Sequence, residues 1–190
     1  MRGHCGRARD ERGASLVEAA IILPVVILIV FGIIEFSLAF KDSLTVSSAT
    51  RAGARTASAE PRQPTFNTDT AKAVARAVSA LPSGSVEQLW IYKANVDGDP
   101  VDGGGSAYTS CNTCAVFTWD VATDQFIRQP GPDWNPMTQN ACVGDSGHDA
   151  VGIYLKVNHD FVTGFFGQRI TLKDHAVMNL EPVTVSQGCK

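Results

Sequence analysis

Residues 19–40 read AAIILPVVILIVFGIIEFSLAF, and this stretch decides the fold. Glu35 and Ser37 are the polar side chains in it. At about 1.5 Å per residue, a helix of this length spans roughly 30 Å, the thickness of the hydrocarbon core of a bilayer. Pro24 and Gly32 lie inside the run, and membrane helices tolerate both residues better than soluble helices do. The stretch therefore predicts one transmembrane helix.

The charges that flank this run predict its orientation. Upstream, Asp10 and Glu11 oppose four arginines, namely Arg2, Arg7, Arg9 and Arg12. Because positive charge is retained on the cytoplasmic side, we expect the N-terminus to be cytoplasmic and the chain after residue 40 to lie outside. A cleaved secretory signal peptide is the alternative, and residues 37–39 loosely resemble its cleavage site. The apolar core of a signal peptide is shorter, at about 7–15 residues, and Glu18 at the start of the run also argues against it.

The composition excludes two classes of protein. The 190 residues carry a formal net charge of −3, from 16 basic and 19 acidic side chains. This balance argues against a nucleic-acid partner bound through phosphate neutralisation. With 44% hydrophobic and 18% charged residues, the chain is too apolar to be disordered. Its length fits one ordinary domain with an appendage.

A short motif immediately precedes the apolar run. Residues 12–18 read RGASLVE, and Glu18 places a carboxylate at the membrane edge, where it is costly unless paired or hydrated. This junction resembles the class III leader of type IV pilin-like proteins. Residues 31–36 (FGIIEF) and 49–55 (ATRAGAR) narrow the resemblance to the TadE-like pseudopilins of tight-adherence (Flp) pili. The matching region covers about residues 12–57.

The resemblance implies a processing event and an assembly role. It implies that a prepilin peptidase cuts after Gly13, so that residues 1–13 are a cytoplasmic leader and Ala14 becomes the new N-terminus. It also implies that the Ala14 ammonium pairs with Glu18 of a neighbouring subunit. The residues themselves leave alternatives open: Glu18 is a hydrated acid in the headgroup zone, and Glu35 is either a snorkelling or protonated acid or a paired one.

The helical pattern continues beyond the membrane. Residues 41–59 contain no proline, so one helix of about 70 Å is predicted over residues 14–60. Small and apolar side chains recur on one face, at Val46, Ala49, Gly53 and Ala57. We expect this stripe to pack on the protein's own sheet rather than on a partner helix. Pro61 ends the helix, and Thr68 is the expected N-cap of a second, short helix that runs to Pro82.

Residues 61–190 are predicted to form an extracytoplasmic head that combines this second helix with an antiparallel sheet. Alternating or β-rich runs predict strands at residues 85–94, 115–121, 125–128, 151–161 and 168–183. The fourth strand is expected to bury one face, and Asp174 is interpreted as a bulge in the fifth. The aromatic side chains of residues 161–167 are interpreted as core caps in preference to an exposed contact tip. The predicted fold class is therefore α+β, which the resemblance also suggests.

Five cysteines fall into two compartments. Cys5 lies in the leader and is expected to be cytoplasmic and reduced. The others lie outside, where disulfides persist, and they are Cys111, Cys114, Cys142 and Cys189. Four cysteines allow three connectivities, and we expect at least one bridge between the segment 111–114 and Cys142.

Isolated motifs suggest redox, zinc and protease chemistry that their surroundings do not support. The CNTC motif at residues 111–114 precedes a predicted strand, whereas a redox site of this kind needs a helix. The cysteines and His148 lack the ligand spacing of a zinc site. Residues 144–147 read GDSG, like the nucleophile segment of trypsin-like proteases, but His4 is the sole histidine before Ser146 and lies across the membrane. We therefore expect no catalytic residue and no enzyme activity.

The acidic loop after the first predicted strand is also a poor metal site. Residues 95–100 imitate a calcium loop but carry Pro100 where glycine is required. A different calcium site, made of Asp97, Asp99 and Asp102, is the remaining alternative. His159 and His175 are interpreted as packed or solvated. We expect no metal and no cofactor.

Two functional hypotheses remain. The first is a pilin-like subunit that is cut after Gly13 and assembled through its helix, with the lipid bilayer, a prepilin peptidase and other pilin-like subunits as partners. The second is a single-pass anchored or secreted binding module with a disulfide-bonded head, unrelated to pili. A mature N-terminus at Ala14 supports the first, whereas Met1 or a start after Ala39 supports the second. The sequence leaves open a filament, tip or membrane-retained role, and a pilus for adhesion, DNA uptake or secretion.

Overall fold

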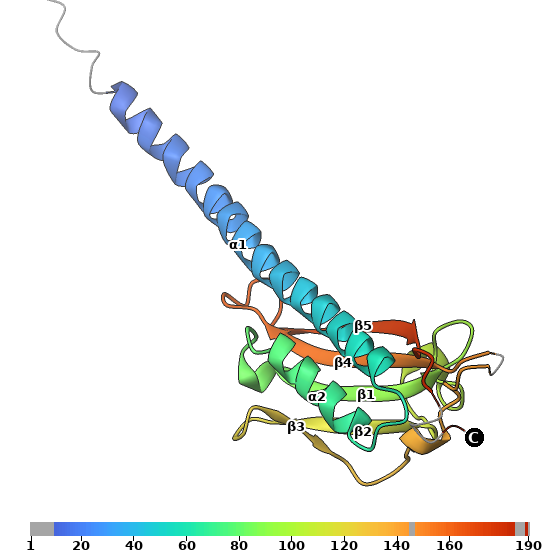
Figure 1. Cartoon of the computed structure of the whole chain (residues 1–190). Helices are drawn as coiled ribbons and strands as arrows, with labels where there is room; N and C mark the ends of the chain where they lie inside the picture. Colours follow the sequence, from blue (N-terminus) through green and yellow to red (C-terminus); the bar gives the residue numbers. More distant parts are fainter. Residues whose placement is uncertain (1–9, 145–146, 185–188, 190) are drawn as a thin grey trace, which may run out of the picture.

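The computed structural model describes residues 10–144, 147–184 and 189, and it has the predicted α+β fold. Helix α1 (Asp10–Ala59) carries a head made of helix α2 (Phe66–Ala77) and a five-stranded antiparallel sheet (Figure 1). The strands lie in the order β3-β2-β1-β4-β5. Their bounds are β1 (Val86–Ala94), β2 (Cys114–Asp120), β3 (Gln125–Arg128), β4 (Ala150–Asp160) and β5 (Arg169–Asn179). Most of the leader, with Cys5, and Ser146 of the GDSG motif lie outside the described residues.

Helix α1 has two parts with different surroundings. Residues 13–31 are exposed on every side, and this half of the helix projects away from the head (Figure 1). From Gly32 onward, one stripe is buried at spacings of three and four residues: Gly32, Glu35, Ala39, Asp42, Val46, Ala49, Gly53 and Ala57. This pattern confirms that the predicted small-residue stripe packs on the protein's own head. The head also contacts the outer end of the apolar run. Because that run is hydrophobic on all sides, its sequence does not show which side contacts the head.

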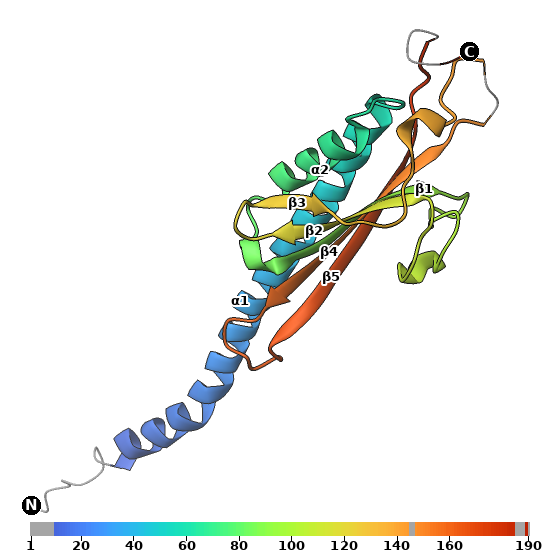
Figure 2. The same ribbon diagram turned by 90° about the horizontal axis from the view of Figure 1, so that it is seen from below.

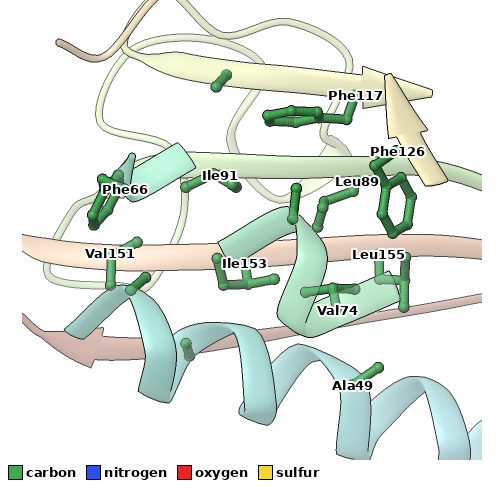
Figure 3. Close-up of a cluster of buried hydrophobic side chains, with 14 of the residues drawn as sticks. Ala49, Phe66, Val74, Leu89, Ile91, Phe117, Phe126, Val151, Ile153 and Leu155 are labelled. Atoms are coloured by element: carbon green, nitrogen blue, oxygen red, sulfur yellow. The ribbon is translucent and has the colours of Figure 1, made fainter. Parts of the chain in front are cut away.

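The main core lies between the sheet and the two helices. Figure 3 shows Leu89 and Ile91 of β1 beside Ile153 and Leu155 of β4, with Val74 of α2 below them in this view. All of these side chains are fully buried. At about 25 cal/mol per Å² of apolar surface, this layer contributes the largest favourable term to folding of the head.

The opposite face of the sheet is also covered, which corrects the prediction that β4 buries one face. The loop that follows β1 lies on the side of the sheet away from the helices (Figure 2). Trp90, Tyr92 and Tyr154 form a second buried layer on this face. Tyr108 from that loop stacks on Tyr154, with 4.0 Å between ring centroids. Burial raises the pKa of the Tyr92 phenol, which stays neutral and donates a hydrogen bond of 2.8 Å to the carbonyl of Gly98. Tyrosine occurs both in protein cores and at surfaces, so the alternating pattern of these strands does not predict a second buried layer.

Several element boundaries differ from those predicted. Helix α2 begins at Phe66, so Thr68 lies inside it and is not its N-cap. Strand β5 ends at Asn179, and its pairing with β4 is continuous, so Asp174 marks no bulge. The irregularity lies instead in β1, between Val86 and Gln88.

We expect Gly53→Val to destabilise the head. A Cβ at Gly53 lies 2.5 Å from Cγ2 of Val74 and 3.2 Å from Cγ2 of Ile153, so the larger side chain overpacks the core. The expected loss is about 1–3 kcal/mol of unfolding free energy. Urea unfolding of the full chain in detergent micelles, followed by tryptophan fluorescence, measures it. The control Gly84→Val, at a position where a Cβ meets nothing within 4 Å, should stay within about 0.5 kcal/mol; equal effects of both variants contradict the packing argument.

Candidate functional site

The residues of the predicted processing site lie together on the free end of α1. Gly13, Ala14 and Glu18 are within the helix and exposed. Ala14 and Glu18 are four residues apart, so they share one side of the helix about one turn from each other. A Cβ at Gly13 would meet nothing within 4 Å, so packing within this chain does not require glycine there.

The free half of α1 has the dimensions of a membrane segment. At about 1.5 Å per residue, residues 13–31 extend roughly 28 Å, close to the thickness of a hydrocarbon core. Large apolar side chains are exposed around the helix, among them Leu16, Ile21, Leu28 and Phe31. In the part of the chain that the structure describes, α1 is the one helix long and apolar enough to cross a membrane. This surface is the candidate anchor and the candidate surface for helix–helix assembly.

Glu35 is held by the head, which decides against a snorkelling side chain. Its side chain is fully buried although its neighbours on α1 are exposed. The backbone N–H of Val162 donates to Glu35 Oε2 at 2.9 Å, and the N–H of Thr163 donates to Oε1. The carboxylate is thus neither snorkelling nor paired with a cation. Its partners are backbone amides more than 120 positions away, which no sequence signal indicates.

The β4–β5 loop, defined here as residues 161–168, rests on α1 beside Glu35 (Figure 2). The rings of Phe166 and Phe36 have centroids 5.3 Å apart, and the ring of Phe166 also packs against Gly32. Val162 and Phe165 are 74% and 69% exposed. The prediction that these aromatics cap the core is therefore wrong. The sheet ends at Asp160, so the loop extends past the core and meets the helix alone.

A second polar contact joins α1 to the end of β4. His159 Nδ1 lies 2.7 Å from Asp42 Oδ2, and the histidine side chain is 6% exposed. Of the two interpretations of His159, packed or solvated, the structure shows the packed one. The ring of Phe161 lies edge-on to the imidazole, with centroids 5.4 Å apart. This pair and the Glu35 contact fix the base of the head to the helix at two heights.

Charged pairs mark the side of the head next to the loop. Arg169 Nε lies 2.5 Å from Asp160 Oδ1, and this pair closes the strands at the base of the loop. The hydrogen bond from Arg169 lowers the pKa of the Asp160 carboxyl. On the sheet nearby, Lys156 Nζ lies 2.5 Å from Glu87 Oε2, and this contact holds the pKa of Glu87 below its ordinary value. These groups stay charged at neutral pH and favour a hydrated setting.

The disulfides differ from the predicted pairing. Cys111 bonds to Cys114, and Cys142 bonds to Cys189, so no bridge links the segment 111–114 to Cys142. The sheet separates the two pairs. Cys111 and Cys114 belong to the aromatic layer on one face, whereas Cys142 and Cys189 pack against the main core on the other. Sequence spacing carries no information about which face a cysteine reaches.

The acidic loop after β1 uses its polar groups internally. Asn95 Oδ1 accepts the backbone N–H groups of Asp97 and Asp99, and Asp102 accepts hydrogen bonds from the N–H and hydroxyl of Thr113. Among residues 13–144, 147–184 and 189, no group of three or more His, Cys, Asp or Glu side chains is placed to hold a metal ion. The hydrogen bonds of Asn95 and Asp102 account for the loop shape.

The fold is a disulfide-bonded α+β head on one long helix, and the free half of that helix is a candidate membrane anchor. A family model described as TadE-like protein matches residues 13–55, which confirms the resemblance seen in the motifs. Comparisons with curated proteins and with solved structures found no match. The TadE-like segment and the apolar helix fit a membrane protein associated with a tight-adherence pilus.

We expect the two disulfides to contribute unequally to stability. The Cys142–Cys189 bridge closes 47 residues and the Cys111–Cys114 bridge closes 3, so loop entropy assigns them about 4 and about 2 kcal/mol. Urea unfolding of the Cys142→Ser/Cys189→Ser and Cys111→Ser/Cys114→Ser variants measures the difference. Peptide mapping of the non-reduced protein is the companion experiment, and a bridge from Cys142 to Cys111 or Cys114 would refute the assignment.

Proposed function

We propose that this protein is a membrane-anchored pseudopilin or pilus-assembly subunit of a tight-adherence (Flp) pilus. A prepilin peptidase cuts it after Gly13, and the mature chain assembles through α1. One observation supports this proposal most directly: the TadE-like match includes residues 13–31, an apolar helix segment that is exposed on every side. If α1 served only to complete the core of the head, residues 13–31 would be expected to be buried as well. An exposed apolar surface of this size instead marks an interaction site.

The proposed topology follows from charge and from the position of the head. The arginines of the leader hold the N-terminus in the cytoplasm, and the head lies outside the cell membrane. The disulfides of the head are compatible with that compartment, since disulfides persist where thiols are not kept reduced. The partners are the lipid bilayer, the prepilin peptidase and other pilin-like subunits.

In this proposal, Ala14 and Glu18 drive assembly. Cleavage converts the Ala14 amide into an ammonium one helical turn from Glu18. Within residues 13–144, 147–184 and 189, Glu18 has no hydrogen bond or ion pair, which supports a role for its carboxylate in contacts with another subunit. Pairing between subunits neutralises two charges at the membrane edge, where isolated charges are costly. The head contributes surface and spacing, and it has no catalytic role.

We expect Gly13→Leu to block maturation and to leave membrane insertion intact. A Cβ at this position meets nothing within 4 Å, and the apolar run that sets insertion is unchanged. N-terminal mass spectrometry of the membrane fraction should find Ala14 in the wild-type protein and the uncut chain in the variant. Gly6→Leu, the same change within the leader, is the matched control and should be processed. Normal cleavage of Gly13→Leu, or a mature start after Ala39, would overturn the proposed processing.

We expect Glu18→Gln to impair assembly more than processing or membrane residence. The substitution removes the charge while keeping volume and helix propensity, so the anchor persists. The Ala14 ammonium then lacks its partner and loses an interaction that exceeds the ~0–1 kcal/mol of an exposed pair, because it lies in a low-dielectric assembly. Co-purification of pilin-like subunits and counts of surface pili measure the loss. Glu11→Gln, which neutralises an acid on the removed side of the cut, is the control; unchanged assembly by Glu18→Gln would reduce Glu18 to a hydrated interfacial acid.

A further inference from the structure

We propose that the β4–β5 loop is a second membrane contact of this protein. Val162, Phe165 and Phe166 lie in the outer interfacial layer of the bilayer, beside α1. The proposal rests on the membrane-anchored function proposed above and adds a lipid-binding surface to the head. Four observations support the proposal: the position of the loop, its exposed side chains, its hydrogen bonds and its flanking charges.

The loop meets α1 inside the apolar run. Phe166 contacts Gly32 and Phe36, and Gly32 lies eight residues before residue 40, or about 12 Å along the helix axis. The free segment of residues 13–31 is roughly as long as a hydrocarbon core is thick. A bilayer that covers this segment therefore meets the loop at its outer surface. A bilayer that extends to residue 40 encloses the loop.

The loop presents apolar side chains away from the protein. Val162 is 74% exposed and Phe165 is 69% exposed, whereas Leu155 and Val157 of β4 are buried. Phe40, on the neighbouring turn of α1, is also exposed. Exposed aromatic and aliphatic side chains next to a membrane helix are the composition of an interfacial anchor.

Several backbone amides of the loop are already hydrogen-bonded, which suits a poorly hydrated environment. Glu35 accepts the N–H groups of Val162 and Thr163. Within the loop, Phe161 N–H donates to the carbonyl of Gln168 at 3.0 Å, and Gly167 N–H donates to the carbonyl of Gly164 at 3.4 Å. Unsatisfied amides cost several kcal/mol in lipid, so these bonds remove much of the penalty for inserting an irregular segment. Glu35 is in turn shielded from lipid by the amides that it binds.

The charged groups at the base of the loop set how far it enters. The exposed Asp160–Arg169 pair lies immediately outside the loop, and Lys41 follows the end of the apolar run on α1. Charges of this kind remain at the headgroup level because the hydrocarbon core excludes them. The loop tip therefore reaches the boundary between headgroups and acyl chains, about 5–10 Å below the surface.

Lipid is the occupant that this surface favours over a second copy of the chain. A groove of about 760 Å³ runs between Phe166 and α1 and is lined by Leu28, Ile29, Ile33, Phe36 and Phe40. It is continuous with the exposed apolar surface of residues 13–31. Since that surface faces acyl chains in an anchored subunit, lipid enters the groove without further assembly.

A depth measurement tests the proposal on the full chain. In a Cys5→Ser background, Phe165→Cys carries a nitroxide label, and the protein is reconstituted into phosphatidylcholine–phosphatidylglycerol vesicles. Collision of the label with oxygen and with a water-soluble nickel chelate is measured by power saturation. Val96→Cys, fully exposed in the turn after β1 at the far end of the head, is the aqueous control. Leu23→Cys, exposed on the free half of α1, is the lipid control.

We expect nickel collision at residue 165 to be roughly tenfold lower than at residue 96, because a polar complex is excluded from the acyl region. Equal nickel collision at the two positions would place the loop in water and overturn the proposal. Shielding from both reagents, with spin–spin broadening that disappears on dilution with unlabelled protein, would assign the surface to a second copy instead. Nickel access at residue 23 would instead refute the membrane anchor, so the two failures are distinguishable.

A substitution of the contact that holds the loop gives an independent readout. Glu35→Ala removes the acceptor of the Val162 and Thr163 amides, so the label at residue 165 should become more mobile and several times more accessible to nickel. Ser37→Ala, which removes an exposed hydroxyl bonded to the Ile33 carbonyl, is the matched control on α1. An unchanged label in Glu35→Ala would contradict the role of Glu35 in positioning the loop at this depth.

Discussion

The structure depends on one continuous helix that satisfies two environments. Over residues 13–31, α1 is apolar in every direction, whereas from Gly32 onward it buries a single stripe against the head. Small residues let the head approach closely, and at Gly53 the side chains of Val74 and Ile153 fill the space that a Cβ would need. Because the head packs along the outer half of the helix, the free half extends from it at a defined position.

The sheet works as a partition within the head. One face packs on α1 and α2, and the other is closed by a loop held with Tyr92, Tyr108 and the Cys111–Cys114 bridge. The Cys142–Cys189 bridge ties the C-terminal segment to the first face. Because both faces of the sheet are covered, this small head buries apolar surface on both of them. A sheet with one solvent-exposed face would bury apolar surface on one face only.

Glu35 and Glu18 show how one helix uses two carboxylates differently. Glu35 is buried under the β4–β5 loop and accepts backbone amides, so its charge is compensated within the subunit. Glu18 is exposed on the free half, where compensation has to come from outside the described chain. This difference divides α1 into an outer part that organises the head and an inner part that, in the proposed function, meets lipid and other subunits. The TadE-like match spans both parts, over residues 13–55.

The sequence by itself determined the long helix, the α+β class, the positions of the five strands within a few residues and the small-residue stripe. Each of these follows from local periodicity, which the chain carries in its own order. It also carried the TadE-like motif around Gly13 and Glu18. The tertiary structure alone decided the partner of Glu35, the second buried face, the disulfide pairs and the docking of Phe166 on Gly32. These join residues far apart in the chain, and their geometry depends on which face of the sheet and which side of the helix each segment reaches, information that spacing along a sequence does not contain.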